Sequence, residues 1–122
     1  MSLSLAVRTQ LSSSFTLDVT MEAPPGITIV FGASGSGKST LLRSVAGLIR
    51  PDAGSIAIGG RVLFDASNDL SLPVRQRRVG YVFQQLALFP HMSIADNLAY
   101  GLNDRPVDVR RDQIDAIAES FR

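Results

Sequence analysis

The chain has 122 residues, with 12 Lys and Arg against 11 Asp and Glu, which gives a net charge of +1. This length is enough for one hydrophobic core, and 45% hydrophobic with 19% charged residues is typical of a folded chain rather than a disordered one. The small charge gives no support to a nucleic-acid surface, and zero cysteines exclude disulfides and thiolate metal sites. No apolar run approaches the ~20 residues of a membrane span.

The first part of the chain predicts strands. Apolar and polar residues alternate over residues 3–8 and again over residues 15–19, and we expect these two segments to pair. A turn at Pro24-Pro25-Gly26 follows. The β-branched run over residues 27–31 is typical of a buried central strand.

A helix is predicted next, followed by a hairpin. Gly47 and Pro51 mark the end of the helix, and its apolar face consists of Leu41, Leu42, Val45, Ala46 and Leu48. Residues 55–58 and 61–64 predict a hairpin about Gly59-Gly60, and the polar residues 65–73 predict a loop.

The last part of the chain predicts one more strand and two helices. Residues 79–83 read as a strand, and residues 94–101 as a short helix with Ser93 as its N-cap. Residues 108–122 predict a helix whose apolar face needs a packing partner; that face consists of Ile114, Ile117, Ala118 and Phe121.

A glycine-rich loop between the third predicted strand and the first helix matches the pattern G-x-x-x-x-G-K-[ST] in full. Its residues are Gly32, Ala33, Ser34, Gly35, Ser36, Gly37, Lys38, Ser39 and Thr40. Glycines let the backbone N–H groups approach crowded phosphate oxygens, and the helix that follows aims its N-terminal N–H groups at the same anion. The pattern therefore predicts a triphosphate site, for which a plain glycine-rich turn is the alternative.

Two side chains of this loop carry the predicted chemistry. Lys38 is the single lysine among the 12 basic residues. Its compact ammonium suits the β- and γ-phosphates, where the planar fork of arginine would be too bulky. Ser39 is the predicted Mg²⁺ ligand, because magnesium prefers hard oxygen ligands.

The loop alone does not choose among nucleotide-dependent enzymes. A GTPase would need an N-K-x-D motif and a D-x-x-G motif, and neither occurs in the chain. A small-molecule kinase would need a substrate-binding lid, which residues 84–102 do not resemble. A module that binds nucleotide or phosphate without turnover is a further alternative, and phosphate release separates it from an ATPase.

A second block covers residues 77–102. The predicted strand ends at Phe83 and presents Gln84, whose amide oxygen can ligate magnesium and sense the γ-phosphate. The Leu88-Phe89-Pro90 stretch that follows reads as an exposed apolar loop, which suggests a partner surface. His91 reads as a loop residue, and Arg77 with Arg78 as a solvated flank.

Both blocks, with the segment Pro-Asp-Ala-Gly-Ser-Ile-x-Ile-Gly-Gly between them, resemble the ATP-binding subunit of ABC transporters over essentially the whole chain. The resemblance implies an α/β P-loop NTPase fold, with a RecA-like core and an N-terminal antiparallel β-subdomain. It implies that ATP and Mg²⁺ are bound, that Lys38 and Gln84 are catalytic and that Ser39 and Gln84 ligate the metal. Gln84 matches the family's Q-loop glutamine, which couples the site to the membrane subunits.

The resemblance also implies partners. It places transmembrane permease subunits against residues 84–102, pairs the intact protein as a homodimer of ATPase subunits, and locates it peripherally at the cytoplasmic face of the membrane, with no nucleic-acid partner. Within the family the chain most resembles molybdate importer ATPases, through residues 26–28, 60–63 and 77–84. Sugar and polyamine importers share much of residues 88–91 and stay alternatives.

The chain also departs from the family pattern. The L-S-G-G-Q signature, the Walker B strand with its catalytic Glu and the switch histidine do not occur, and residues 62–65 read as hairpin rather than Walker B. We therefore expect residues 1–122 to be the N-terminal portion of one nucleotide-binding domain, truncated before these motifs, with the helical subdomain starting near residues 104–122. Alone, this portion should show little turnover. Phe15 is the nearest candidate to stack on adenine, although a strand Phe is more often a core residue.

Overall fold

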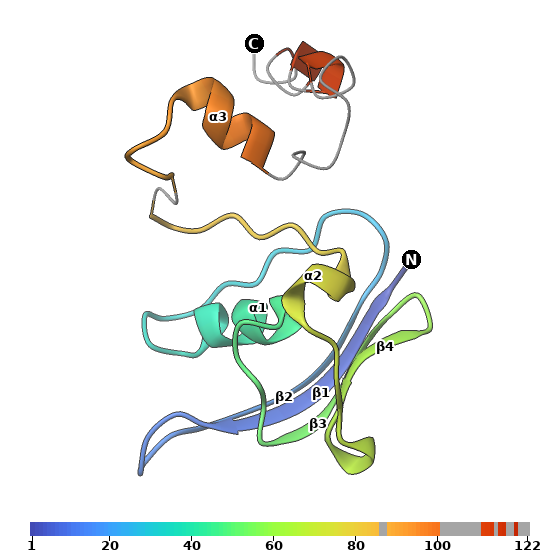
Figure 1. Ribbon diagram of the computed structural model, residues 1–122. Helices are drawn as coiled ribbons and strands as arrows, with labels where there is room; N and C mark the ends of the chain where they lie inside the picture. The colour runs from blue at the N-terminus through green and yellow to red at the C-terminus, as the bar shows by residue number, and fades with distance from the viewer. Residues whose placement is uncertain (86–87, 101–110, 114, 117–118, 120–122) are drawn as a thin grey trace. The chain divides into compact units, whose positions relative to one another are not determined.

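The computed structural model describes residues 1–85, 88–100, 111–113, 115–116 and 119. These residues belong to two units, Met1–Tyr81 and Val82–Arg122. Along the chain the elements are β1 (Leu3–Gln10), β2 (Thr16–Ala23), α1 (Lys38–Ala46), β3 (Ala53–Ile58), β4 (Arg61–Asp65), the 3-10 turn η1 (Ala66–Asn68), β5 (Leu70–Ser71), α2 (Val74–Arg77) and α3 (Ile94–Ala99) (Figure 1).

The first unit is built on an antiparallel sheet with the strand order β2-β1-β3-β4-β5. Its register places Leu5 of β1 opposite Ile56 of β3, and Val7 opposite Val19 of β2. Both predicted strand pairs, β1 with β2 and β3 with β4, are confirmed. The α/β class and the antiparallel N-terminal subdomain are therefore present.

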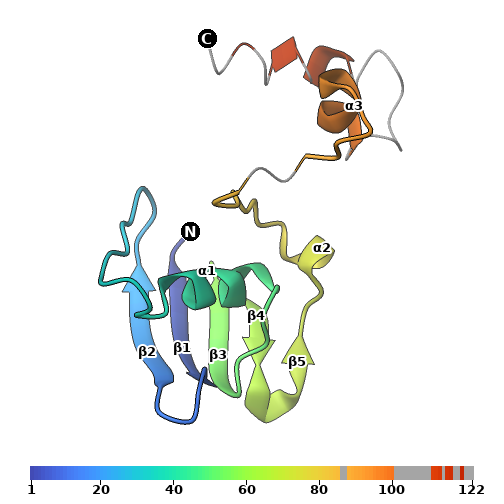
Figure 2. The same ribbon diagram turned by 90° about the vertical axis from the view of Figure 1, so that its left-hand side faces the viewer.

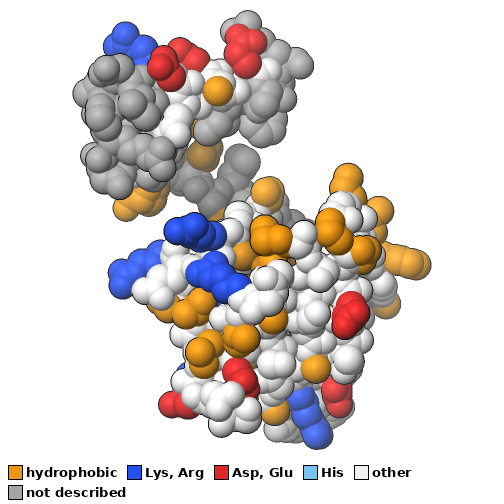
Figure 3. Space-filling model, turned by 90° about the vertical axis from the view of Figure 1, so that its right-hand side faces the viewer, with side chains coloured by type: hydrophobic (Ala, Val, Ile, Leu, Met, Phe, Trp, Pro, Cys, Tyr) orange, Lys and Arg blue, Asp and Glu red, His pale blue; other side chains and the backbone are white. Residues whose placement is uncertain are grey.

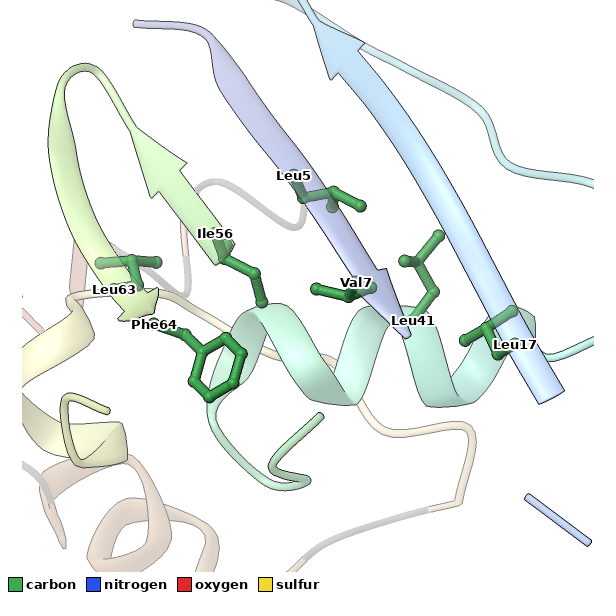
Figure 4. Close-up of a cluster of buried hydrophobic side chains, with 7 residues drawn as sticks. All are labelled: Leu5, Val7, Leu17, Leu41, Ile56, Leu63 and Phe64. Atoms are coloured by element: carbon green, nitrogen blue, oxygen red, sulfur yellow. The ribbon is translucent and has the colours of Figure 1, made fainter. Parts of the chain in front are cut away.

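One face of this sheet is covered by α1, which lies across the strands (Figure 2). Alternation along β1 buries Leu5 and Val7, whose side chains lie between the sheet and the helix together with Leu41 of α1 (Figure 4). The buried cluster consists of Leu5, Val7, Leu17, Leu41, Ile56, Leu63 and Phe64. The core thus fixes α1, and with it the loop that precedes α1, against the sheet.

The predicted helix is confirmed, and glycines bound it on both sides. Gly37 at its N-cap has φ +98° and Gly47 at its C-cap has φ +88°, which are left-handed conformations that favour glycine. Inside the helix, the Ser44 hydroxyl donates to the Thr40 carbonyl at 2.7 Å. Leu48, expected on the helical face, lies beyond the helix end.

Two predicted strands are absent from the described elements. Residues 27–31 do not form a strand, and Ile27 and Phe31 are 95% and 91% exposed. Residues 79–83 do not form one either, and Val82 is 96% exposed. A strand needs neighbours for its backbone N–H and C=O groups, and neither segment joins the antiparallel sheet. Hydrophobic side chains are visible on the molecular surface in Figure 3.

The predicted loop over residues 65–73 is more regular than expected. It contains η1 and β5, and β5 pairs with β4 through Phe64↔Ser71 and Asp65↔Leu70. Asp65 starts η1 by accepting hydrogen bonds from the Ser67 N–H at 3.1 Å and the Ser67 hydroxyl at 2.7 Å. Short polar side chains that bond the local backbone favour such turns.

The second unit contains α3. The Ser93 hydroxyl accepts a hydrogen bond from the Asp96 N–H at 3.1 Å, so the predicted N-cap is confirmed. Residues 111–113, 115–116 and 119 are helical. The apolar face expected for this last helix lies outside the described residues; it consists of Ile114, Ile117, Ala118 and Phe121. No helix within the described ranges is long and apolar enough to cross a membrane.

Candidate phosphate-binding site

The glycine-rich loop turns tightly before α1. Gly35 and Gly37 have φ of +80° and +98°, values that residues with a Cβ rarely adopt. The loop is closed by a hydrogen bond from the Ser36 N–H to the Ala33 carbonyl at 3.1 Å. A Cβ on Gly32 would lie 3.1 Å from the Ser36 hydroxyl oxygen. Glycine at these three positions therefore allows a close backbone turn that other residues would obstruct.

The Lys38 side chain folds back across this loop. Its ammonium donates to the carbonyls of Gly32 at 2.6 Å and Ala33 at 2.8 Å, and lies 3.5 Å from the Ser36 hydroxyl. The ammonium is therefore held by the backbone carbonyls at the start of the loop, beside the Ser36 side chain.

Helix α1 begins at Lys38 and points its N-terminal end at the loop. Within the described part of the chain, the backbone N–H groups of Lys38, Ser39 and Thr40 have no hydrogen-bond acceptor. The first turn of α1 holds no acidic residue. Free N–H groups, the positive end of the helix dipole and a lysine ammonium together favour an anion, and a phosphate fits this chemistry.

The predicted site residues fall in two places. Residues 32–40 lie together in the first unit, with the Ser39 side chain exposed. Gln84 belongs to the second unit, where it is exposed and follows Phe83 in a bend. The role of Gln84 at the phosphate site stays a prediction.

The apolar loop after Gln84 is held by a side chain that sequence reasoning missed. The Asn97 amide oxygen accepts from the Phe89 N–H at 2.8 Å, and its nitrogen donates to the Ser93 carbonyl at 2.8 Å and the Met92 carbonyl at 3.3 Å. Leu88 is 61% exposed, as expected for this stretch. No local sequence signal marks Asn97, because its partners depend on the loop conformation.

Two further predictions from the sequence concern His91, read as a loop residue, and Phe15, read as a core residue. His91 lies in an exposed turn, with its ring 5.9 Å from that of Phe89, so its reading as a loop residue is confirmed. Phe15 precedes β2, is 38% exposed and lies outside the buried cluster. The interpretation of Phe15 as a core residue is therefore wrong.

The prediction that Arg77 belongs to a solvated flank is wrong, because its side chain is buried. It is 3% exposed, whereas its neighbour Arg78 is exposed as expected. The Arg77 guanidinium donates to the carbonyls of Ser44 at 2.9 Å and Leu72 at 2.7 Å. Burial lowers the pKa of Arg77. No local pattern distinguishes the two arginines, since only the packing of distant segments buries one of them.

The pattern of the ABC transporter family matches residues 16–122. The chain belongs to this family, and the resemblance inferred from its two motif blocks is confirmed. It is 49% identical over 105 residues to the molybdenum import ATP-binding protein ModC of Paramagnetospirillum magneticum, covering 86% of this chain and 29% of that protein.

Other proteins of the same name are similar. The one from Mesorhizobium japonicum is 46% identical over 86% of this chain and 28% of its own length. The one from Salmonella typhimurium is 51% identical over 71% of this chain and 24% of its own length. The chain thus spans less than a third of the length of these relatives.

Proposed function

We propose that residues 1–122 are the N-terminal portion of a nucleotide-binding domain and bind the phosphates of ATP with Mg²⁺. The observation that carries this proposal is the Lys38 ammonium folded over the loop, 2.6 Å from the Gly32 carbonyl, beside free N–H groups at the start of α1. This arrangement supplies hydrogen-bond donors and positive charge at one point, as a polyphosphate requires.

Each site residue has a role in this proposal. The backbone of residues 32–40 surrounds the phosphates, and Lys38 donates to the β- and γ-phosphate oxygens. Ser39, whose side chain is exposed at the first turn of α1, ligates Mg²⁺ through its hydroxyl. Bound magnesium supplies charge neutralisation of the β- and γ-phosphates. Gln84 is the second proposed protein ligand, through its amide oxygen.

The whole protein is proposed to be an importer ATPase. Family membership and the names of the molybdenum import proteins support ATP hydrolysis coupled to uptake of molybdate. The partners would be a second ATPase subunit and transmembrane permease subunits that contact residues 84–102, at the cytoplasmic face of the membrane. Sugar or polyamine uptake is the alternative. Stimulation of ATP hydrolysis by molybdate in the assembled importer separates the two.

Lys38→Ala tests the phosphate site directly. Calorimetric titration of the protein with ATP in the presence of Mg²⁺ should show binding to the unmodified chain and none to the variant, because the only lysine ammonium at the loop is lost. Arg43→Ala is the matched control, since Arg43 is exposed on the same helix and also basic. Equal ATP affinity of Lys38→Ala and the unmodified chain would refute the assignment.

Turnover is tested separately by phosphate release. The 122-residue chain should bind ATP and release little phosphate, because it contains no L-S-G-G-Q motif and no catalytic Glu after a Walker B strand. Sustained release by this chain, abolished by Lys38→Ala, would show that residues 1–122 suffice for hydrolysis.

A further inference from the structure

Arg77 joins two segments that are distant in sequence. It is the last residue of α2, and its guanidinium contacts the C-terminal turn of α1 and the segment around β5. We propose that Arg77 is a positioning residue that holds α1 so that its N-terminal end presents the phosphate loop. The inference rests on the proposed function, because it concerns the same site.

The contacts at the C-terminal end of α1 match the chemistry of a helix end. One guanidinium nitrogen donates to the carbonyls of Ser44 at 2.9 Å and Val45 at 3.2 Å. The last carbonyls of a helix lack partners within the helix and carry the negative end of its dipole. A buried cation with several donors satisfies both, and this end of α1 is fixed by it.

The same guanidinium reaches the other segment. Its Nε donates to the Leu72 carbonyl at 2.7 Å, and its second terminal nitrogen donates to the Ser71 hydroxyl at 3.2 Å. Ser71 belongs to β5, at the edge of the sheet. Arg61 of β4 in turn donates to the Arg77 carbonyl at 3.1 Å and also bonds the Gln76 carbonyl. Arg77 therefore ties α1 to the β4–β5 edge.

Gly47 makes room for this contact. A Cβ on Gly47 would lie 2.7 Å from Nε of Arg77 and 3.0 Å from its Cζ, so a larger residue would displace the guanidinium. The φ of +88° at Gly47 independently favours glycine. The helix end and the arginine thus fit each other closely.

The two ends of α1 are mechanically connected. The helix has nine residues, about 14 Å at the usual rise, and Leu41 near its N-terminal end packs in the core. Ser44 and Ala46 in its C-terminal half are buried too, so the helix lies against the sheet along its length and moves as one body. Loss of the guanidinium contacts at its C-terminal end therefore changes the tilt of the whole helix on the sheet. Such a tilt displaces Lys38, Ser39 and the loop amides, and phosphate binding depends on small displacements of this kind.

The first experiment needs no nucleotide. Amide ¹H–¹⁵N spectra of the 122-residue chain would compare the unmodified protein with Arg77→Ala and with Arg78→Ala, the exposed neighbour. We expect the loop amides of Gly35, Gly37 and Ser39 to shift in Arg77→Ala and to stay in place in Arg78→Ala. Unshifted loop amides in a folded Arg77→Ala would overturn the inference.

The second experiment measures ATP affinity. Arg77→Ala should weaken ATP binding about tenfold, because α1 and the loop before it are no longer held in the binding position once the guanidinium's hydrogen bonds are lost. Arg78→Ala should stay within about twofold of the unmodified chain. Arg77→Lys keeps the charge and the stem and should recover part of the loss, as its single ammonium cannot reproduce the fork. Unchanged affinity in Arg77→Ala, with ATP bound normally by the unmodified chain, would also overturn it.

The outcomes separate this inference from the proposed function. If the unmodified chain fails to bind ATP, the proposed function fails, while the spectra still decide whether Arg77 positions the loop. If Arg77→Ala does not fold, Arg77→Lys carries both experiments; a Lys variant with unshifted loop amides and full affinity would contradict the role of the fork.

Discussion

A Cβ placed on Gly37 would lie 2.8 Å from Cδ1 of Leu17, so the last glycine of the glycine-rich loop lies directly against a core leucine of β2. Leu17 is 5% exposed and belongs to the buried cluster. The loop before α1 therefore packs against strand β2, and this contact with the antiparallel sheet helps to hold the loop in place. Small changes at this contact should affect both stability and phosphate binding.

Gly37→Ala should destabilise the chain and abolish ATP binding. The φ of +98° is unfavourable for alanine and costs about 1–3 kcal/mol, and the added methyl group would push against Leu17. Thermal unfolding and calorimetric ATP titration measure the two effects. Gly60→Ala is the matched control, because Gly60 has φ +79° with no atom within 4 Å of a Cβ; it should lose stability and keep ATP affinity. Normal ATP binding by Gly37→Ala would refute the contact's role.

Ile56→Ala should lower the free energy of unfolding by about 2–5 kcal/mol, the usual cost of a large-to-small change in a core. Ile56 is fully buried in β3 between β1 and β4. Val62→Ala, in the neighbouring strand but 41% exposed, should cost about 1 kcal/mol or less. Denaturant unfolding of both variants tests this prediction, and similar losses would show that the buried cluster is not the core.

Asp65 should make stability depend on acid pH. Hydrogen bonds from Ser67 and Asn68 hold the pKa of Asp65 below its ordinary value of 3.8. Because the folded-state pKa is the lower one, the stabilisation is fully present above 3.8 and is lost as the pH falls through the folded-state pKa. The difference in stability between the unmodified chain and Asp65→Asn should therefore shrink at low pH.

The donors to Asp65 provide a second test of this pH dependence. Asn68→Ala removes one of them, the side-chain N–H that lies 2.6 Å from the carboxylate. The pKa of Asp65, followed by NMR titration, should rise in this variant. A stability difference for Asp65→Asn that stays constant across the acid range would contradict the assignment.

Asn97→Ala should loosen the loop that follows Gln84. The variant loses the acceptor of the Phe89 N–H and the donor to the Ser93 carbonyl, so amide hydrogen exchange at Phe89 should become faster. Asn97→Asp is the matched control, since its carboxylate still accepts from Phe89 but cannot donate to Ser93. Equal exchange rates at Phe89 in the unmodified chain and Asn97→Ala would show that Asn97 does not hold the loop.

Local patterns predicted local structure well. The hairpin of β3 and β4, the helix α1 with Gly47 at its end and the Ser93 cap all follow from residues within a few positions of one another. The prediction of a strand over residues 27–31 was wrong, because a strand depends on a pairing partner elsewhere in the chain. The β-branched run there indicates burial in a sheet, but a strand exists only where another segment pairs with it.

The sequence by itself determined the turn of the glycine-rich loop and the charge beside it, because the glycines, Lys38 and Ser39 stand at fixed local spacing. Only the tertiary structure decided that Arg77 is buried while Arg78 is exposed. Ser44 lies 33 residues before Arg77 in the chain, and the Ser44 and Val45 carbonyls reach the guanidinium because α1 packs on the sheet. Burial depends on distant partners, and no local pattern contains them.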